Sequence, residues 1–402
     1  MGSVRQPLSA AALLIAMVLT ACTAKTPLYK KVALSEMQRW PEASYIDGQQ
    51  GRLKWNYTTG LELKALLDCC EKDGSVPSLE YVKAWYDAVI DSTGAIGGGY
   101  KKSNYSLDHI CPGRTLFGLI EFYPEEKYFK ALDTLYQQIK EQPRTPEGGF
   151  WHKKIYPDQM WLDGLYMAMP FYAQYTRDFI PDSLKAANYA DIVHQFSLAY
   201  EHCYDAATGL LRHAWDSSHQ MFWCDPSTGQ SKHAWGRALG WYCMALVDVI
   251  GIMDCETAAE TGKESLETIL LNIFDALKQY ADTETGLWYQ VLDCPGREGN
   301  YLEATCNAMF SYAFSKAVNL GIYDDAAYTG ELYEKMVAHF VSRDEQGLVN
   351  LNDCCEVAGL GGKQNRSGDY DYYIHEPVRA NDPKGIGPLI WAAREYEFIN
   401  KR

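Results

Sequence analysis

Apolar residues recur at steps of three and four along most of the chain after about residue 34, and sustained alternation of apolar and polar residues is almost absent. Steps of this size place the apolar side chains on one face of an α-helix. The clearest helical segments are predicted over residues 60–70, 78–91, 127–140, 184–200, 236–253, 265–280, 304–320 and 329–341. We therefore expect an all-α protein.

A short loop motif separates these helices in pairs. It consists of a glycine followed closely by large apolar residues, and it occurs at Gly148, Gly209, Gly286 and Gly347, with a weaker copy at Gly94. The first four glycines lie 61, 77 and 61 residues apart, and each interval has room for two helices and their turns. Repeats of this kind predict stacked helical hairpins.

Six such hairpins would use the length of the chain and could close into a ring. We therefore expect an (α/α)6 barrel, a double-layered helical toroid of six hairpins. The alternative is an open helical solenoid, although solenoids normally show more regular repeats and distinct capping units. No long Pro/Ser-rich linker or low-complexity tract interrupts residues 34–402, which are expected to form a single domain.

The N-terminal segment is predicted to be a lipoprotein signal peptide spanning residues 1–21. Arg5 precedes a short apolar run over 8–19, which is too short to cross a bilayer, and the run ends in a lipobox-like LTAC sequence. Cleavage would leave Cys22 as the lipidated first residue, with 22–33 as a tether. We expect an envelope lipoprotein, on the periplasm-facing side of the outer membrane because residues 23–26 lack an acidic run. Ordinary secretion is the alternative.

The composition excludes some partners. A formal net charge of −15 argues against nucleic acid, because phosphate binding needs a basic surface. The twelve cysteines include two vicinal pairs, and none of them forms a zinc-type cluster with histidine. Most are therefore expected to be small buried hydrophobes, with one or two disulfides remaining open.

The strongest candidate for chemistry is Asp163, the only ionisable residue in the apolar stretch 159–170. We predict a helix here with Asp158 as its N-cap and with Met160, Asp163 and Met167 on one face. Loss of hydration would raise the pKa of Asp163 toward the range useful for a general acid. Alternatively, a carboxylate near a helix start complements the helix dipole, which lowers the pKa.

Other polar groups lie among aromatic residues and have two interpretations each. Asp108 is either a second acid or an N-cap, and Lys153 either meets an anionic ligand or is solvated. The Gly- and Pro-rich segment 368–385 either closes one face of the ring over a ligand or locks the last hairpin onto the first.

Arg237 and Trp241 lie four residues apart, and Trp235 precedes them. On one face of a helix this set suits a ring that carries a carboxylate, because guanidinium binds the carboxylate and indoles cover the ring. The alternative is a core pair of tryptophans with the arginine reaching outward. We find no phosphate-binding glycine loop, nucleophile elbow, dinucleotide motif or HExxH zinc motif.

Three stretches, MWLDGLYM (160–167), WGRALGWY (235–242) and NDPKG (381–385), resemble glycoside hydrolase family 105, the unsaturated rhamnogalacturonyl hydrolases, which are related to the unsaturated glucuronyl hydrolases of family 88. The similarity runs from about residue 54 to the C-terminus. It implies an (α/α)6 barrel that acts on pectin oligosaccharides already cut by a lyase. Such anionic substrates carry a 4,5-unsaturated uronic acid at the non-reducing end.

The resemblance also implies roles for individual residues. The family hydrates the C4=C5 enol ether and needs no metal or other cofactor, and no obligate protein partner is evident. Asp163 would protonate C4 and assist the addition of water at C5, with Asp108 as a second acid in the pocket. Arg237 would meet the uronate carboxylate. The implied substrate-binding residues are His152, Lys153, His213, Trp235, Arg237 and Trp241, with Tyr57 as a weaker candidate.

Two other functions remain open. The same fold could hydrolyse unsaturated glucuronyl products of glycosaminoglycan or algal polysaccharides. A chain of a different class would be a non-catalytic, sugar-binding envelope lipoprotein, but a binding protein has no need of a desolvated acid.

Overall fold

A computed structural model describes residues 26–70, 76–253 and 262–400, so the predicted signal peptide and Cys22 lie outside the described residues. Helices dominate, and the strands form only two-stranded ladders. In the described part of the chain, no helix has the length and apolar character to cross a membrane. The expected all-α class is confirmed.

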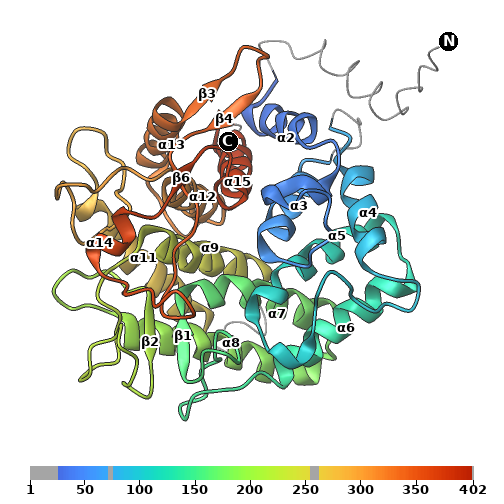
Figure 1. Cartoon of the computed structure of the whole chain (residues 1–402), viewed down its shortest axis with the longest axis horizontal. Helices are drawn as coiled ribbons and strands as arrows, with labels where there is room; N and C mark the ends of the chain where they lie inside the picture. The colour runs from blue at the N-terminus through green and yellow to red at the C-terminus, as the bar shows by residue number, and fades with distance from the viewer. Residues whose placement is uncertain (1–25, 71–75, 254–261, 401–402) are drawn as a thin grey trace.

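The helices form two concentric layers (Figure 1). Around the inner ring, α3 packs on α15, α15 on α12, α12 on α9 and α9 on α7. Helix α5 also packs on α3 and closes the ring against α7, where the rings of Phe117 and Phe171 lie 5.2 Å apart. The inner helices are α3 (Tyr57–Asp68), α5 (Arg114–Phe122), α7 (Leu162–Phe179), α9 (Gly236–Ile252), α12 (Ala304–Asn319) and α15 (Pro383–Ile399).

The outer helices are α2 (Leu28–Arg39), α4 (Ser78–Val89), α6 (Glu126–Lys140), α8 (Asp182–Cys203), α11 (Lys263–Tyr280) and α13 (Ala326–Phe340). Each packs on an inner helix, and α2 packs on α15, so the first and last of the described helices share one hairpin. The arrangement is the expected barrel of six hairpins. Residues 28–33, predicted as part of a tether, instead belong to α2 with Tyr29, Val32 and Ala33 buried. The folded domain therefore begins at Leu28.

The eight helices predicted from the apolar pattern are confirmed to within three residues at each end. Three helices of the barrel have no clear apolar pattern in the sequence. Helix α5 has only nine residues, α15 contains Pro388, and the short α2 lies in the segment predicted as a tether.

The predicted loop repeat is also confirmed. Each of its glycines follows an outer helix and has a positive φ, from 73° at Gly209 and Gly286 to 93° at Gly148. The weaker copy at Gly94 has a φ of 89°. Residues with a side chain rarely adopt this conformation, which explains why glycine recurs where the chain turns back toward an inner helix.

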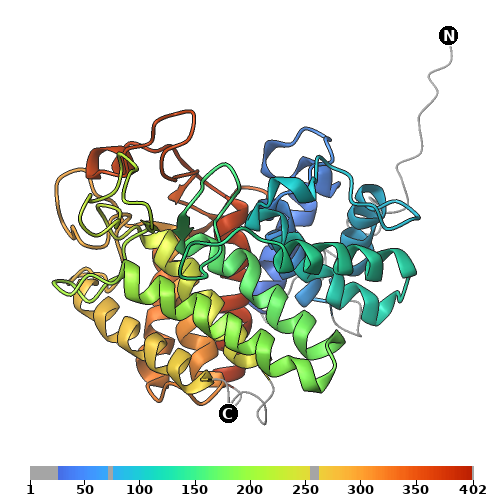
Figure 2. The ribbon, with the colours of Figure 1, turned by 90° about the horizontal axis from the view of Figure 1, so that it is seen from below.

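Because every inner helix precedes or follows an antiparallel outer one, the inner N-termini all lie at one end of the barrel. Figure 2 shows the long loops gathered at this end. They contain η3 (Leu107–His109), α14 (Tyr370–Ile374) and two ladders, of β1 (Gln159–Trp161) with β2 (Ala214–Asp216) and of β5 (Cys354–Cys355) with β6 (Val378–Arg379). The remaining ladder pairs β3 (Val341–Arg343) with β4 (Val349–Leu351).

Arg379 joins the last inner helix to the first. Its Nε donates to Asp382 Oδ2 at 2.7 Å, and its Nη2 lies 2.5 Å from Asp47 Oδ1. Asp47 in turn accepts a hydrogen bond from Thr58 in the first turn of α3 at 2.7 Å. This part of the Gly- and Pro-rich segment therefore locks the last hairpin onto the first, as one of its two interpretations predicted.

The cysteines behave largely as expected. Eight of the ten described cysteines are buried. Burial raises the pKa of several of their thiols, including Cys224 to about 11 and Cys111 to about 12. These thiols stay protonated at neutral pH and serve as small core residues.

Two carboxyl groups of helices α2 and α3 are buried. Glu36 of α2 and Glu62 of α3 are each about 1% exposed, and both Glu62 carboxyl oxygens lack a hydrogen-bond partner among the described residues. Burial raises the pKa of Glu36 to about 7, although Arg39 acts in the opposite direction. Burial also raises the pKa of Glu62 well above its ordinary value. Glu36 is therefore protonated in the native state below pH 7.

We predict that Glu36→Gln stabilises the protein at pH 8 and not at pH 5. A folded-state pKa above the unfolded value means that stability is lost as pH rises through about 7. The full shift corresponds to a cost on the order of 3 kcal/mol above that pH. Urea unfolding at both pH values measures the difference. Glu331→Gln on the exposed side of α13 is the control, and an equal effect of Glu36→Gln at both pH values would contradict the prediction.

Candidate active site

The inner helices bring four separated segments to the loop end of the barrel. Tyr57 is the first residue of α3, Asp163 and Arg237 are the second residues of α7 and α9, and Asp108 lies in η3 just before α5. Unpaired N–H groups and the helix dipole make helix N-termini favourable for anions. The predicted site residues thus meet where an anionic ligand is favoured.

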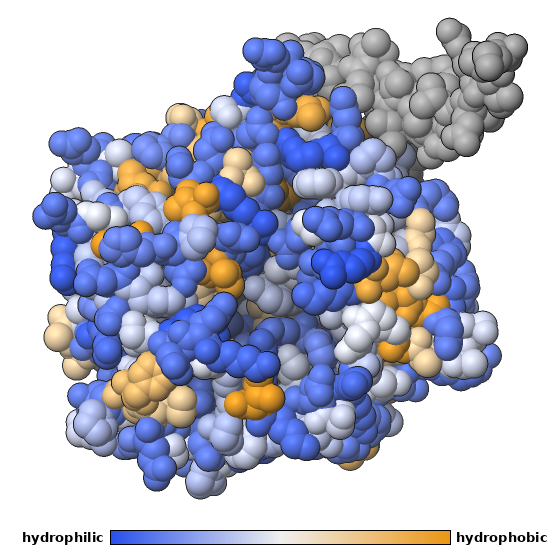
Figure 3. All heavy atoms as spheres, in the orientation of Figure 1, coloured by the Kyte–Doolittle hydropathy of each residue, from blue (hydrophilic) through white to orange (hydrophobic). Residues whose placement is uncertain are grey.

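A cleft of about 520 Å³ opens at this end. Figure 3 shows the same face hollowed near its centre. Tyr57, Asp108 and Lys153 line the cleft, and its other charged lining residues are Asp47, Lys54, Glu356, Arg379 and Lys384. Four cationic side chains therefore line this one cleft, although the whole chain is strongly acidic.

Asp163 is not among the residues that line this cleft, and its side chain is 16% exposed. Tyr57 connects the two regions, because the charges of Asp108, Arg237 and Asp163 all act on its hydroxyl group. Burial and Asp108 raise the pKa of Tyr57 well above its ordinary value. Tyr57 therefore presents a neutral hydroxyl at the wall of the cleft.

The β1–β2 ladder places Asp163 beside His213. Trp161 pairs with Ala214 across the ladder. His213 directly precedes Ala214, and α7 begins directly after Trp161. Asp163 Oδ2 lies 3.2 Å from His213 Nε2, in a close polar contact that is not a linear hydrogen bond. His213 itself is fully buried.

Two expectations about Asp163 were wrong. Burial acts to raise its pKa, as expected, but His213, His152 and Arg237 outweigh burial and lower the pKa below its ordinary value. The local pattern also misplaced the helix start, because α7 begins at Leu162 and Trp161 is its N-cap residue. Asp158 has a φ of 61° outside the helix, and Met160 belongs to β1.

Asp108 is the second carboxylate of the site, with 16% of its side chain exposed. Its Oδ2 forms an ion pair with Lys153, and its Oδ1 lies 3.5 Å from His152 Nε2. Burial acts to raise the pKa of Asp108, but Lys153 and His152 outweigh it and lower the pKa. Asp108 caps no helix, since Gly113 occupies the N-cap of α5. Lys153 is likewise paired with a carboxylate and is not simply solvated.

His152 lies between the two acids. Its ring stacks on Trp161 with centroids 4.7 Å apart, and burial lowers its pKa to about 4. It is therefore neutral at neutral pH. Close packing explains the glycine of the WLDG sequence, because a Cβ atom at Gly164 would lie 3.0 Å from His152 Nδ1.

Arg237 is held under an indole. Its guanidinium carbon lies 4.7 Å from the ring centroid of Trp235, and its Nη1 donates to the carbonyl of Cys355. Only 1% of Arg237 is exposed, so it does not reach outward. Trp241 stacks instead on Tyr166, with ring centroids 4.7 Å apart. The predicted pair with Trp235 is thus present, whereas the contact of Trp241 is with other aromatic rings.

Sequence reasoning missed a role for Tyr373. Its hydroxyl lies 2.7 Å from His213 Nδ1, and its ring stacks on Trp235 at 5.9 Å. Tyr373 belongs to the Gly- and Pro-rich segment that is predicted either to close one face of the ring over a ligand or to lock the last hairpin onto the first, but no local signal indicates a partner 160 residues away.

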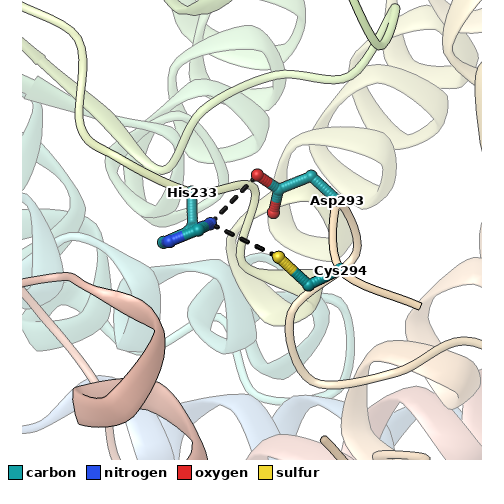
Figure 4. Close-up of side chains that lie close together, drawn as sticks. All are labelled: His233, Asp293 and Cys294. Atoms are coloured by element: carbon teal, nitrogen blue, oxygen red, sulfur yellow. Dashed lines mark hydrogen bonds and ion pairs between the residues drawn. The ribbon is translucent and has the colours of Figure 1, made fainter. Parts of the chain in front are cut away.

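A second cluster of His233, Asp293 and Cys294 brings possible metal ligands within 4.8 Å of one another (Figure 4). The Asp293 carboxylate already accepts a hydrogen bond from Arg212 at 2.7 Å and another from the Ala234 N–H at 3.1 Å. A guanidinium in contact with this carboxylate opposes a cation there. The cluster joins the loop that precedes α9 to the loop that follows α11.

The family model for Glycosyl Hydrolase Family 88 matches residues 28–399. The protein belongs to this family. The match begins at the first residue of α2 and ends at the last residue of α15, so it covers the whole barrel. This family 88 protein is therefore a glycoside hydrolase.

Individual relatives agree. A solved structure of a family 105 glycoside hydrolase from C. acetobutylicum ATCC 824 is 39% identical, covers 93% of this chain and 100% of its own, and has a TM-score of 0.86. A structure of a possible family 105 member from Klebsiella pneumoniae is 22% identical, with coverages of 99% and 96% and a TM-score of 0.72. Protein Atu3128 of Agrobacterium fabrum is 37% identical over 242 residues, which cover 57% of this chain and 97% of that protein. The predicted resemblance to families 105 and 88 is confirmed.

We predict that Lys153→Gln raises the pKa of Asp108. Burial then acts on this carboxyl without its strongest opposing charge. Carbon-13 NMR titration of the aspartate carboxyl groups measures the shift. Lys154→Gln is the matched control, because Lys154 lies against the ring of Tyr105 and not against Asp108. An unchanged Asp108 titration in Lys153→Gln would show that the ion pair does not set this pKa.

Proposed function

We propose that this family 88 hydrolase removes a 4,5-unsaturated uronic acid from the non-reducing end of rhamnogalacturonan oligosaccharides made by a lyase. The observation that carries the proposal is the Asp163 carboxylate at the start of α7, which lies 3.2 Å from His213 Nε2 at the same end of the barrel as a cleft lined by four cationic side chains. The 39% identity to a family 105 structure supports the rhamnogalacturonan type of substrate. A lipid anchor at Cys22 would hold the enzyme in the envelope, where such fragments enter the cell.

The reaction requires one group that first donates a proton and then accepts one. The carboxyl group of Asp163 gives its proton to C4, which leaves a positive charge shared by C5 and the ring oxygen. Water then bonds to C5 and returns a proton to the Asp163 carboxylate. The resulting hemiketal opens to a ketone at C5. C1 then carries a hemiacetal, which breaks down to an aldehyde and releases the neighbouring sugar.

The lowered pKa of Asp163 adds a requirement to this scheme. In the free enzyme the carboxylate is ionised at neutral pH, because His213 and the neighbouring charges stabilise the anion. A uronate carboxylate bound close by would raise that pKa, since like charges disfavour ionisation. Asp163 therefore takes up its proton as the substrate binds. Arg237 meets the substrate carboxylate.

We predict that Asp163→Asn abolishes loss of the substrate double bond. The rate is expected to fall by a factor on the order of 10² to 10⁴, because an amide cannot deliver the proton. Ultraviolet absorbance of the C=C bond in an unsaturated rhamnogalacturonan disaccharide measures the reaction. Asp158→Asn, in the same segment but outside the site, should retain wild-type activity.

The same assay separates the alternatives. Loss of absorbance with an unsaturated glucuronyl disaccharide, and not with the rhamnogalacturonan disaccharide, would assign the glucuronyl activity. No loss with either would favour a sugar-binding protein. Activity that survives in Asp163→Asn would keep the reaction and reject the acid.

We also predict that kcat and kcat/KM depend differently on pH. For kcat/KM, the protonated fraction of Asp163 in the free enzyme falls tenfold per pH unit above its lowered pKa, so this parameter should decline from acidic to neutral pH. The decline of kcat should begin at a higher pH, because the bound uronate raises the pKa. Steady-state rates between pH 4 and about 8 test this. A kcat/KM that rises over this range would make the ionised carboxylate the active form.

A further inference from the structure

Tyr373 reaches the catalytic region from an element far along the chain. Its hydroxyl oxygen lies 2.7 Å from Nδ1 of His213, while Nε2 of the same ring lies 3.2 Å from Asp163 Oδ2. Tyr373 and His213 are both fully buried. The three side chains therefore form a continuous polar chain that ends at the proposed acid.

Helix α14 holds Tyr373 in place through contacts on several sides. Asp369 caps the helix by accepting from the Tyr372 N–H at 2.9 Å, and Gln290 Nε2 donates to the Tyr373 carbonyl at 3.2 Å. The Tyr370 hydroxyl donates to the Glu298 carbonyl at 2.9 Å. With its ring also stacked on Trp235, the Tyr373 hydroxyl has a fixed position.

The direction of the hydrogen bond follows from the protons available. Burial raises the pKa of Tyr373 well above its ordinary value, so the hydroxyl keeps its proton and can donate it. A neutral imidazole has one N–H donor and one acceptor nitrogen. If Nδ1 carried the ring proton, the lone pair of Nε2 would face the carboxylate of Asp163 at 3.2 Å, which is repulsive.

We propose that Tyr373 is a positioning residue whose hydroxyl donates to His213 Nδ1 and thereby places the imidazole proton on Nε2, facing Asp163. His213 then orients the carboxylate. The effect on catalysis rests on the proposed function of Asp163, whereas the ring proton can be observed without any substrate.

The test uses the full-length enzyme and the variant Tyr373→Phe, which removes one oxygen and keeps the ring on Trp235. Nitrogen-15 NMR of histidine-labelled protein, with His213 assigned by His213→Gln, reports which ring nitrogen carries the proton. We expect a neutral ring protonated on Nε2 in the wild type and a mixture of the two tautomers in Tyr373→Phe. We also expect kcat to fall about tenfold, as for the loss of one hydrogen bond, with KM changed less than about twofold.

Tyr370→Phe is the matched control. It removes a hydroxyl from the same helix, but one that bonds to a backbone carbonyl away from His213. It should leave the His213 signals and kcat unchanged, so an equal effect of both variants would assign Tyr373 a merely structural role. A wild-type His213 that is protonated on Nδ1, or on both nitrogens, overturns the proposal even if Tyr373→Phe does not fold. A wild type with the expected tautomer but no activity on either disaccharide would reject the proposed function alone.

Discussion

The site depends on closure of the ring, and closure depends on the first and last of the described helices sharing one hairpin. Helix α15 packs between α12 and α3 and carries α2 on its outer side. Arg379 ties its N-terminus to Asp47 and so to the start of α3. Without that seam the first and last inner helices would each expose an apolar face, and their N-termini would not be held around one cleft. Stability and the geometry of the site therefore have the same origin.

Parallel inner helices also impose an electrostatic constraint, because their N-termini concentrate unpaired N–H groups at one end. Carboxylates lie at this end, and each has a hydrogen-bond or ion-pair partner. Glu303 accepts hydrogen bonds from two backbone N–H groups at 2.7 and 2.8 Å, Asp382 pairs with Lys384, and Asp108 pairs with Lys153. Lys153 and Lys384 also line the cleft, together with Lys54 and Arg379. An acidic protein can thus place cationic side chains around one cleft without a large basic surface.

The fold was predictable because its signals are local. The apolar period indicated eight helices, and a glycine with positive φ marked five of the six returns to the inner ring. The site was predictable only in part. Motifs located Asp163 and Arg237, but the pKa of Asp163 depends on His213, which lies fifty residues further along the chain and next to it only through the β1–β2 ladder. Tyr373 was missed for the same reason, since no sequence pattern encodes a contact between distant loops.

The resting state of Asp163 reflects a balance of opposing forces. Burial favours the neutral acid, while His213, Arg237 and the start of α7 favour the anion, and the anion prevails. A group that must protonate carbon is then a weak donor until another negative charge arrives beside it. In the proposed reaction that charge belongs to the substrate itself. The uronate carboxylate both identifies the sugar and shifts the acid toward its protonated form, so recognition and proton supply become one event. A neutral sugar bound in the same cleft would leave Asp163 ionised and unable to act on it.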